Sequence, residues 1–149
     1  MLLWNGLLDM QCLHTKYSYV LDIVTVLRLK VIICNEALYA QAIGNALYGL
    51  QSMNSEYSEV RDIVSALVPK VKSCNDALSD QNVANALYGL QGMNSEYSEV
   101  RDIVSALVPK VKSCNEALSA QAVGNALYGL QSMNSEYSEV RDIVSALVP

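Results

Sequence analysis

Residues 45–69 read NALYGLQSMNSEYSEVRDIVSALVP. Residues 85–109 repeat this stretch with a single change, a glycine in place of serine at position 92, and residues 125–149 repeat it with no change. The segments between these copies also match, so the chain has a period of 40 residues. A fixed period of roughly 20 to 50 residues is typical of solenoids and propellers.

The chain divides into four units in register with this period. The units 45–84 and 85–124 are complete and differ at five positions, whereas residues 5–44 form a degenerate copy and residues 125–149 a partial one. A chain of 149 residues has the usual size of one domain. We therefore predict a single repeat array over residues 1–149.

Apolar residues in the first part of each unit recur at helical spacing. In the last unit, residues 119–133 place one group of apolar side chains on one side of a helix at about 100° per residue: Ala122, Val123, Ala126, Leu127, Leu130 and Met133. We predict this helix, called helix A, over residues 79–93 and 119–133, with Ser119 as its N-cap.

A second amphipathic helix, called helix B, follows a short polar connection. We predict it over residues 58–68, 98–108 and 138–148, with Ser98 capping its start and Pro109 causing a kink or ending the regular helix. Because no segment alternates like a strand, the predicted fold is all-α: an α-solenoid of stacked helix-turn-helix repeats. Its core is expected to contain Leu50, Leu90, Ile63, Ile103 and Cys74.

The four cysteines do not form a metal-binding or disulfide pattern. Cys34, Cys74 and Cys114 are equivalent positions, which stacked helices place roughly 10 Å apart, too far for a disulfide. The sequence has no CxxC pair and one histidine, His14. We predict that the cysteines are buried core residues and that the chain holds no metal and no cofactor.

Composition and motifs argue against several classes of function. The net charge is −5, so a broad basic surface for nucleic acid is absent. No apolar run is long enough to span a bilayer, and no phosphate-binding loop or catalytic triad pattern occurs. We predict a protein without catalytic activity that does not enter a membrane, and an intracellular location.

The side of helix A opposite its apolar stripe carries the candidate ligand-binding residues. Each of the three later units places one tyrosine there with amide side chains around it, and in the last unit the same side also holds Gln121 and Gly124. Tyrosine can stack on a base and amides can bond base edges, which favours single-stranded RNA. The predicted ligand-binding residues are Tyr48, Tyr88, Tyr128, Asn45, Asn85, Asn125, Gln51, Gln91 and Gln131.

Two alternatives remain open for this side of helix A. The tyrosines can instead pack between neighbouring helices, with the asparagines bonded across repeats as a structural ladder. A protein or peptide can also occupy the same surface, which suits the acidic net charge better than RNA does. If the tyrosines bind RNA, their replacement by alanine is expected to change stability little.

Tyrosines at the turn between the helices are expected to hold that turn: Tyr57, Tyr97 and Tyr137.

The motif NALYGL occurs at residues 45–50, 85–90 and 125–130, with a following helix that ends in ALVPKV. It resembles the core motif of the octotricopeptide repeats and the related heptatricopeptide repeats, and the resemblance covers nearly the whole chain. It implies paired helices, RNA binding and processing, and an organellar location. The proline-rich motif and tryptophan of that family are missing between the helices. The pattern is also similar to tandem repeats of bacterial plant-pathogen effectors, which would imply a host-protein partner.

The degenerate first unit carries apolar residues where the later units are polar. These are Tyr19, Leu21, Leu29, Ile32 and Ile33, in the places of Glu59, Arg61, Pro69, Lys72 and Ser73. A terminal repeat normally presents a polar face to water, so an apolar outer face indicates an interface. We predict self-association through the N-terminal repeat, or contact with a further segment of the parent protein.

Overall fold

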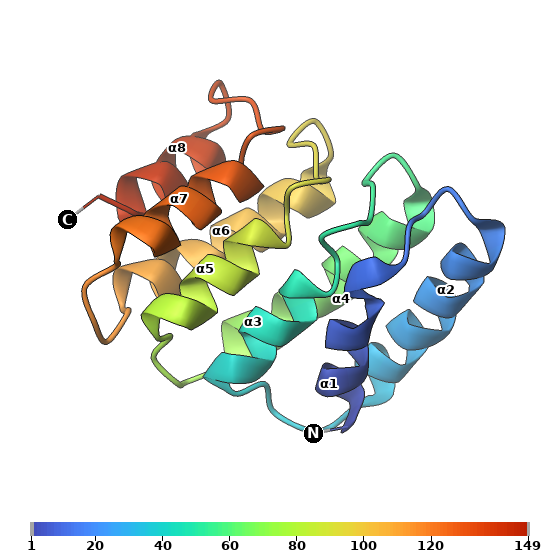
Figure 1. Ribbon diagram of the computed structural model, residues 1–149. Helices are drawn as coiled ribbons and strands as arrows, with labels where there is room; N and C mark the ends of the chain where they lie inside the picture. The colour runs from blue at the N-terminus through green and yellow to red at the C-terminus, as the bar shows by residue number, and fades with distance from the viewer. Residues whose placement is uncertain (1, 149) are drawn as a thin grey trace.

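A computed structural model describes residues 2–148 as eight α-helices and one short 3-10 helix. Figure 1 shows two rows of helices, one in front of the other. The helix A row contains α1 (Leu2–Leu8), α3 (Ala40–Tyr48), α5 (Asp80–Tyr88) and α7 (Ala120–Gly129). The helix B row contains α2 (Ser18–Ile33), α4 (Ser58–Ser73), α6 (Ser98–Lys112) and α8 (Ser138–Ala146), and η1 (Asp9–Cys12) follows α1.

Each helix packs mainly against the equivalent helix of the neighbouring repeat. In the helix A row α1 contacts α3, α3 contacts α5 and α5 contacts α7, and the helix B row is connected in the same way from α2 to α8. This arrangement confirms the predicted all-α solenoid with a spacing of 40 residues. Each repeat buries its apolar side against the next repeat, because one helix pair alone cannot cover that side.

Helix A is shorter than predicted. The helices α5 and α7 end at Tyr88 and Gly129, and the chain continues in tight turns in which Met93 N–H donates to the Leu90 carbonyl. A Cβ atom at Gly89 would lie 1.9 Å from the carbonyl oxygen of Leu47. The backbone at Gly89 therefore touches the backbone of α3, and the regular helix α5 ends at this contact. Ser119 is the N-cap, as predicted, and accepts a hydrogen bond from Ala122 N–H.

Helix B begins where predicted, but its cap and its end differ from the prediction. Tyr97 is the N-cap residue of α6 and makes no side-chain cap, while the Ser98 hydroxyl donates to Glu99. Pro109 lies inside α6, which continues to Lys112. The added turn is held because Val111 is buried and Lys110 donates a hydrogen bond to the carbonyl oxygen of Cys74.

The core runs continuously through all repeats. The residues predicted to be buried are all buried: Leu50, Leu90, Ile63, Ile103 and Cys74. The prediction of buried cysteines is confirmed for Cys74 only. Cys34 and Cys114 are partly buried and Cys12 is exposed, and all four are free thiols. Cys12 lies in η1, outside the repeated position that becomes the core.

The loop NSEYS connects each helix A to its helix B and fastens it to the neighbouring repeat. The buried Ser55 hydroxyl accepts a hydrogen bond from Asn94 N–H of the next repeat. Arg61 donates to the carbonyl oxygens of its own loop and places its guanidinium 4.4 Å from the ring centre of Tyr97. The Tyr97 ring therefore joins its loop to α4 of the preceding repeat, and the idea that the tyrosine holds its own turn stays a prediction.

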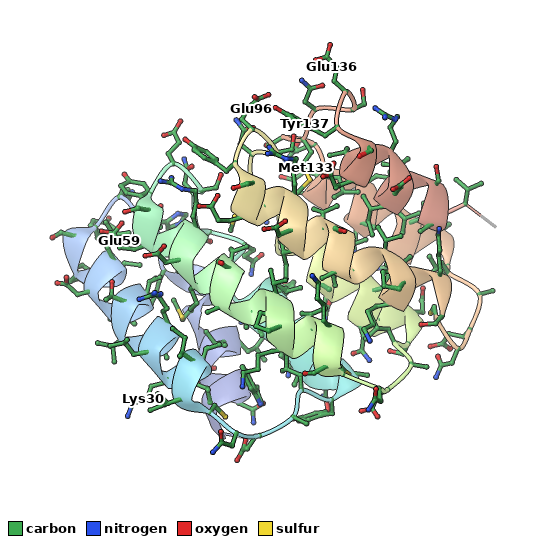
Figure 2. The ribbon with its side chains drawn as sticks, turned by 180° about the vertical axis from the view of Figure 1, so that it is seen from behind. Lys30, Glu59, Glu96, Met133, Glu136 and Tyr137 are labelled. Atoms are coloured by element: carbon green, nitrogen blue, oxygen red, sulfur yellow. The ribbon has the colours of Figure 1, made fainter. Side chains whose placement is uncertain are left out.

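The same loop in the last repeat makes a hydrogen bond to the repeat before it. The Tyr137 hydroxyl donates to Glu96 at 2.8 Å, and Figure 2 shows these two residues close together at the loops. This hydrogen bond, formed by the neutral phenol, raises the pKa of Tyr137 above its usual value of 10.0. The loop thus serves as an inter-repeat contact.

The helix α2 exposes most of the apolar residues predicted for its outer face. Tyr19, Leu29, Ile32 and Ile33 are exposed, whereas Leu21 is partly buried and packs against the core. Leu21 stands where Arg61 stands in the next repeat, so the first repeat has an apolar contact in place of the arginine.

Candidate binding face on the first helix of each repeat

The predicted tyrosines form a continuous stack along the helix A row. Tyr48, Tyr88 and Tyr128 each lie in the last turn of their helices. The ring centres of Tyr48 and Tyr88 are 5.7 Å apart with an angle of 25° between the planes, and those of Tyr88 and Tyr128 are 5.5 Å apart at 19°. These values describe offset stacking. We call these three residues the tyrosine stack.

Stacking decides which parts of the rings a ligand can reach. Both faces of the Tyr88 ring are covered by its two neighbours, so a base cannot enter between repeats unless a ring moves. Tyr48 and Tyr88 are half-buried, while Tyr128 is 49% exposed. The accessible parts are the ring edges and hydroxyls along the row and the outer face of Tyr128.

The predicted asparagines lie beside the tyrosine stack. Asn45, Asn85 and Asn125 are half-buried, one on each of α3, α5 and α7. Within residues 2–148 no hydrogen bond joins one of these asparagines to the next, so the predicted alternative of a bonded asparagine ladder is not formed. The Asn85 side chain instead bonds to Gln81 of its own helix.

A shallow pocket of about 290 Å³ is lined by two of the asparagines and two members of the tyrosine stack. Its lining combines amide and phenol groups of three successive helices: Tyr48, Gln81, Asn85, Tyr88 and Asn125. The Gln81 amide donates to the side-chain oxygen of Asn85 at 2.8 Å, which fixes the orientation of both. Gln81 is the equivalent of Gln121 and was not in the predicted ligand-binding set, although a spacing of four residues places it on the same side of the helix as Asn85.

The predicted glutamines do not join this pocket. Gln51, Gln91 and Gln131 lie in the turns that follow helix A, and Gln51 donates to the side chain of Gln11 at 3.2 Å. Gln91 is half-buried and Gln131 is exposed. Their place on the predicted helix surface depended on a helix that continued past position 90, whereas α5 ends at Tyr88.

Charge on this face differs from that of a nucleic-acid-binding surface. All ten lysines and arginines lie in helix B segments or, for Lys16, in the segment that leads into α2. The helices α1, α3, α5 and α7 contain none. Phosphate contacts supply much of the affinity for nucleic acid, and they require cations.

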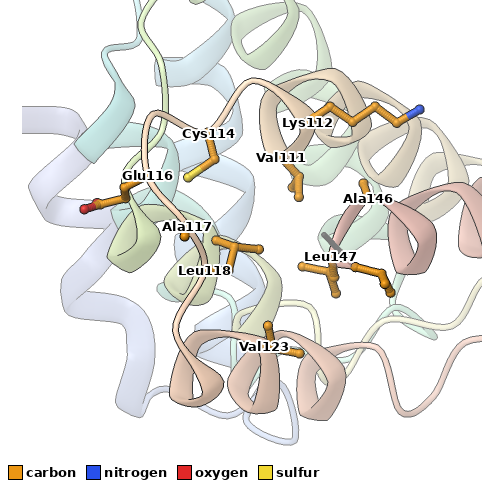
Figure 3. A pocket seen from close by; sticks show the side chains of 10 residues that line it. Val111, Lys112, Cys114, Glu116, Ala117, Leu118, Val123, Ala146 and Leu147 are labelled. Atoms are coloured by element: carbon orange, nitrogen blue, oxygen red, sulfur yellow. The ribbon is translucent and has the colours of Figure 1, made fainter.

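A second, apolar pocket of about 310 Å³ lies at the C-terminal end of the array. Figure 3 shows Val111, Cys114, Leu118 and Leu147 around it. The corresponding residues of the preceding repeat, Cys74 and Leu78, are buried, whereas Cys114 and Leu118 are partly buried. The pocket therefore lies where the equivalent residues of the preceding repeat are covered.

Comparisons with protein-family models, with curated proteins and with solved structures give no match for this chain. Within residues 2–148 no group of histidine, cysteine and acidic residues has the arrangement of a metal site. In the same part of the chain no helix is both long and apolar enough to cross a membrane. The chain is an all-helical protein built from regularly spaced helix pairs.

Proposed function

We propose that the chain is a non-catalytic binding scaffold whose helix A face takes an extended peptide segment of a protein partner. The observation that carries this proposal is the row of half-buried asparagines, one on each of α3, α5 and α7, beside the tyrosine stack. An asparagine amide offers a donor and an acceptor. A peptide backbone presents both to a surface, and an extended segment needs such pairs at regular intervals.

The spacing of the repeats suits an extended peptide. Packed helices lie about 8–10 Å apart, and an extended chain rises about 3.3 Å per residue. An asparagine would therefore meet the peptide at about every third residue. The tyrosine hydroxyls and ring edges beside the asparagines supply further polar and apolar contacts for side chains of the peptide.

Single-stranded RNA is the second candidate for the same face, supported by Tyr128. The outer face of this ring is open and can stack on one base, and the amide of Asn125 lies in the adjoining pocket. The resemblance to octotricopeptide repeats points to the same ligand, and to an organellar location. The peptide is placed first because the helix A row carries no cation for the phosphates.

The test compares a triple variant with a matched double variant. Asn45→Ala, Asn85→Ala and Asn125→Ala together remove the amides of the face. Asn75→Ala and Asn115→Ala remove exposed amides from the loops between helix B and helix A and serve as the control. Peptides selected by the wild-type chain from a random displayed library are expected to bind the triple variant at least about tenfold more weakly, because each lost hydrogen bond is worth roughly 0.5–1.5 kcal/mol. They should bind the control unchanged.

A random pool of single-stranded RNA is presented to the same proteins. Enrichment of RNA instead of peptide, with binding that falls with added salt and with Tyr128→Ala, would replace the first proposal with the second. If neither pool is enriched, or if the control variant loses as much affinity as the triple variant, the helix A face is not the binding surface.

A further inference from the structure

The helix α2 presents an apolar surface away from the rest of the molecule. It packs against α4 and has a smaller contact with α1, whereas α4 and α6 each have a neighbour of their own row on both sides. Ile23 is 39% exposed although the equivalent Ile63 and Ile103 are completely buried. Val26 is 56% exposed and Ile33 is 67% exposed.

Seven of the ten exposed residues of α2 form one stripe, which we call the α2 stripe; Ser18, Thr25 and Ile32 are also exposed and lie beside it. Seven side chains recur at spacings of three and four residues, and all of them are exposed: Tyr19, Asp22, Ile23, Val26, Leu29, Lys30 and Ile33. At 3.6 residues per turn they lie within about 60° of Val26 to either side. Figure 2 shows Lys30 at the outer edge of the molecule, directed away from it.

The composition of the α2 stripe is symmetric about Val26. Tyr19 and Ile33 each lie seven residues from it, Asp22 and Lys30 each lie four residues from it, and Ile23 and Leu29 each lie three residues from it. When two such helices pack antiparallel, residues equally far from the centre on opposite sides face each other. The stripe therefore matches an inverted copy of itself in both shape and charge.

We propose that α2 is an isologous interface through which two copies of the chain form a dimer, with a two-fold axis at Val26. Asp22 of each copy lies opposite Lys30 of the other copy. The dimer then has two ion pairs, one on each side of an apolar centre. Aromatic and aliphatic side chains meet at the ends, Tyr19 against Ile33. A C2 interface requires such self-complementarity, in which each pair of contacts occurs twice.

End-to-end stacking of two copies is a different way to cover α2, and the first repeat does not fit it. Within the chain, Gly49, Gly89 and Gly129 each touch the backbone of the preceding helix A, where a Cβ atom would lie 1.7–1.9 Å from a carbonyl oxygen. Asp9 occupies this position in the first repeat. Its side chain would collide with a helix A docked in the manner of the internal repeats.

The test exchanges the charges of the α2 stripe. Asp22→Lys alone places two like-charged contacts across the axis, and so does Lys30→Asp alone. Each is expected to raise the dimer dissociation constant at least about tenfold, measured by sedimentation over a dilution series. The double variant Asp22→Lys with Lys30→Asp restores opposite charges and should return the constant to within about threefold of the wild-type value. Asp102→Lys changes another exposed aspartate, on α6, and is the control that should leave the constant unchanged.

A second variant tests the apolar centre. Val26→Lys places two lysines at the axis and should abolish the dimer, while the helical circular dichroism spectrum stays unchanged because this side chain is exposed. A wild-type chain that sediments as a monomer at every concentration overturns the proposal. So does a double variant that fails to recover, or an assembly that keeps growing with concentration, which is the mark of end-to-end contacts.

Discussion

At the scale of single residues, Tyr88 differs from the other two members of the tyrosine stack because a ring covers each of its faces. Each stacked pair is worth roughly 0.5–1.5 kcal/mol beyond the area it buries. Tyr88→Ala is therefore expected to lower the free energy of unfolding by about 1–3 kcal/mol, and Tyr128→Ala by about half as much. Urea denaturation of the two variants measures the difference. Equal losses would mean that the rings do not stack in solution.

A loss of stability in Tyr88→Ala would differ from the prediction made from the sequence. That prediction was that replacing these tyrosines by alanine changes stability little. The helical period correctly places the tyrosines and asparagines on one side of helix A, because that side is set by local geometry. The distance between neighbouring rings depends on how closely two helices approach each other. The apolar pattern of one helix does not determine that approach, so the sequence predicted packing between the tyrosines only as one of several alternatives.

At the scale of elements, the starts of helix B were predicted to the residue, at Ser58, Ser98 and Ser138, because the apolar period and the polar loop meet there. The ends of helix B differ from the prediction. Pro109 indicated a break, yet α6 continues to Lys112, because Val111 is buried and Lys110 donates a hydrogen bond to the Cys74 carbonyl. Those contacts come from the neighbouring repeat, so the local sequence alone could not predict them.

The loop between helix A and helix B offers a matched comparison of an inter-repeat contact. Arg61 and Arg141 make the same hydrogen bonds to their own loops, but Arg61 also lies over the Tyr97 ring and 3.8 Å from Glu99. Arg61→Ala is expected to lower the free energy of unfolding by about 1 kcal/mol more than Arg141→Ala, since the cation–π contact is lost. Equal urea midpoints for the two variants would show that this contact adds nothing.

At the scale of the whole molecule, one glycine at each contact between neighbouring helices sets the separation of the helix A row. Gly89 has a negative φ, so it is required for the close approach to Leu47 and not for an unusual backbone conformation. Gly124, in contrast, has open space around the position of a Cβ atom, and Ala84 stands at its equivalent. Of these two glycines, only Gly89 is therefore required by the packing of the helix A row.

The pair Gly89→Ala and Gly124→Ala tests whether the array behaves as one cooperative body. Gly89→Ala forces α5 away from α3 and is expected to cost about 1–3 kcal/mol, the usual cost of overpacking. Because the stability of a solenoid depends on contacts between neighbours, this loss should also broaden the urea transition as the two halves uncouple. Gly124→Ala should raise the free energy of unfolding by about 0.5–1 kcal/mol through helix propensity alone. A Gly89→Ala protein that is as stable and as cooperative as the wild type would contradict the close approach on which the helix A row is built.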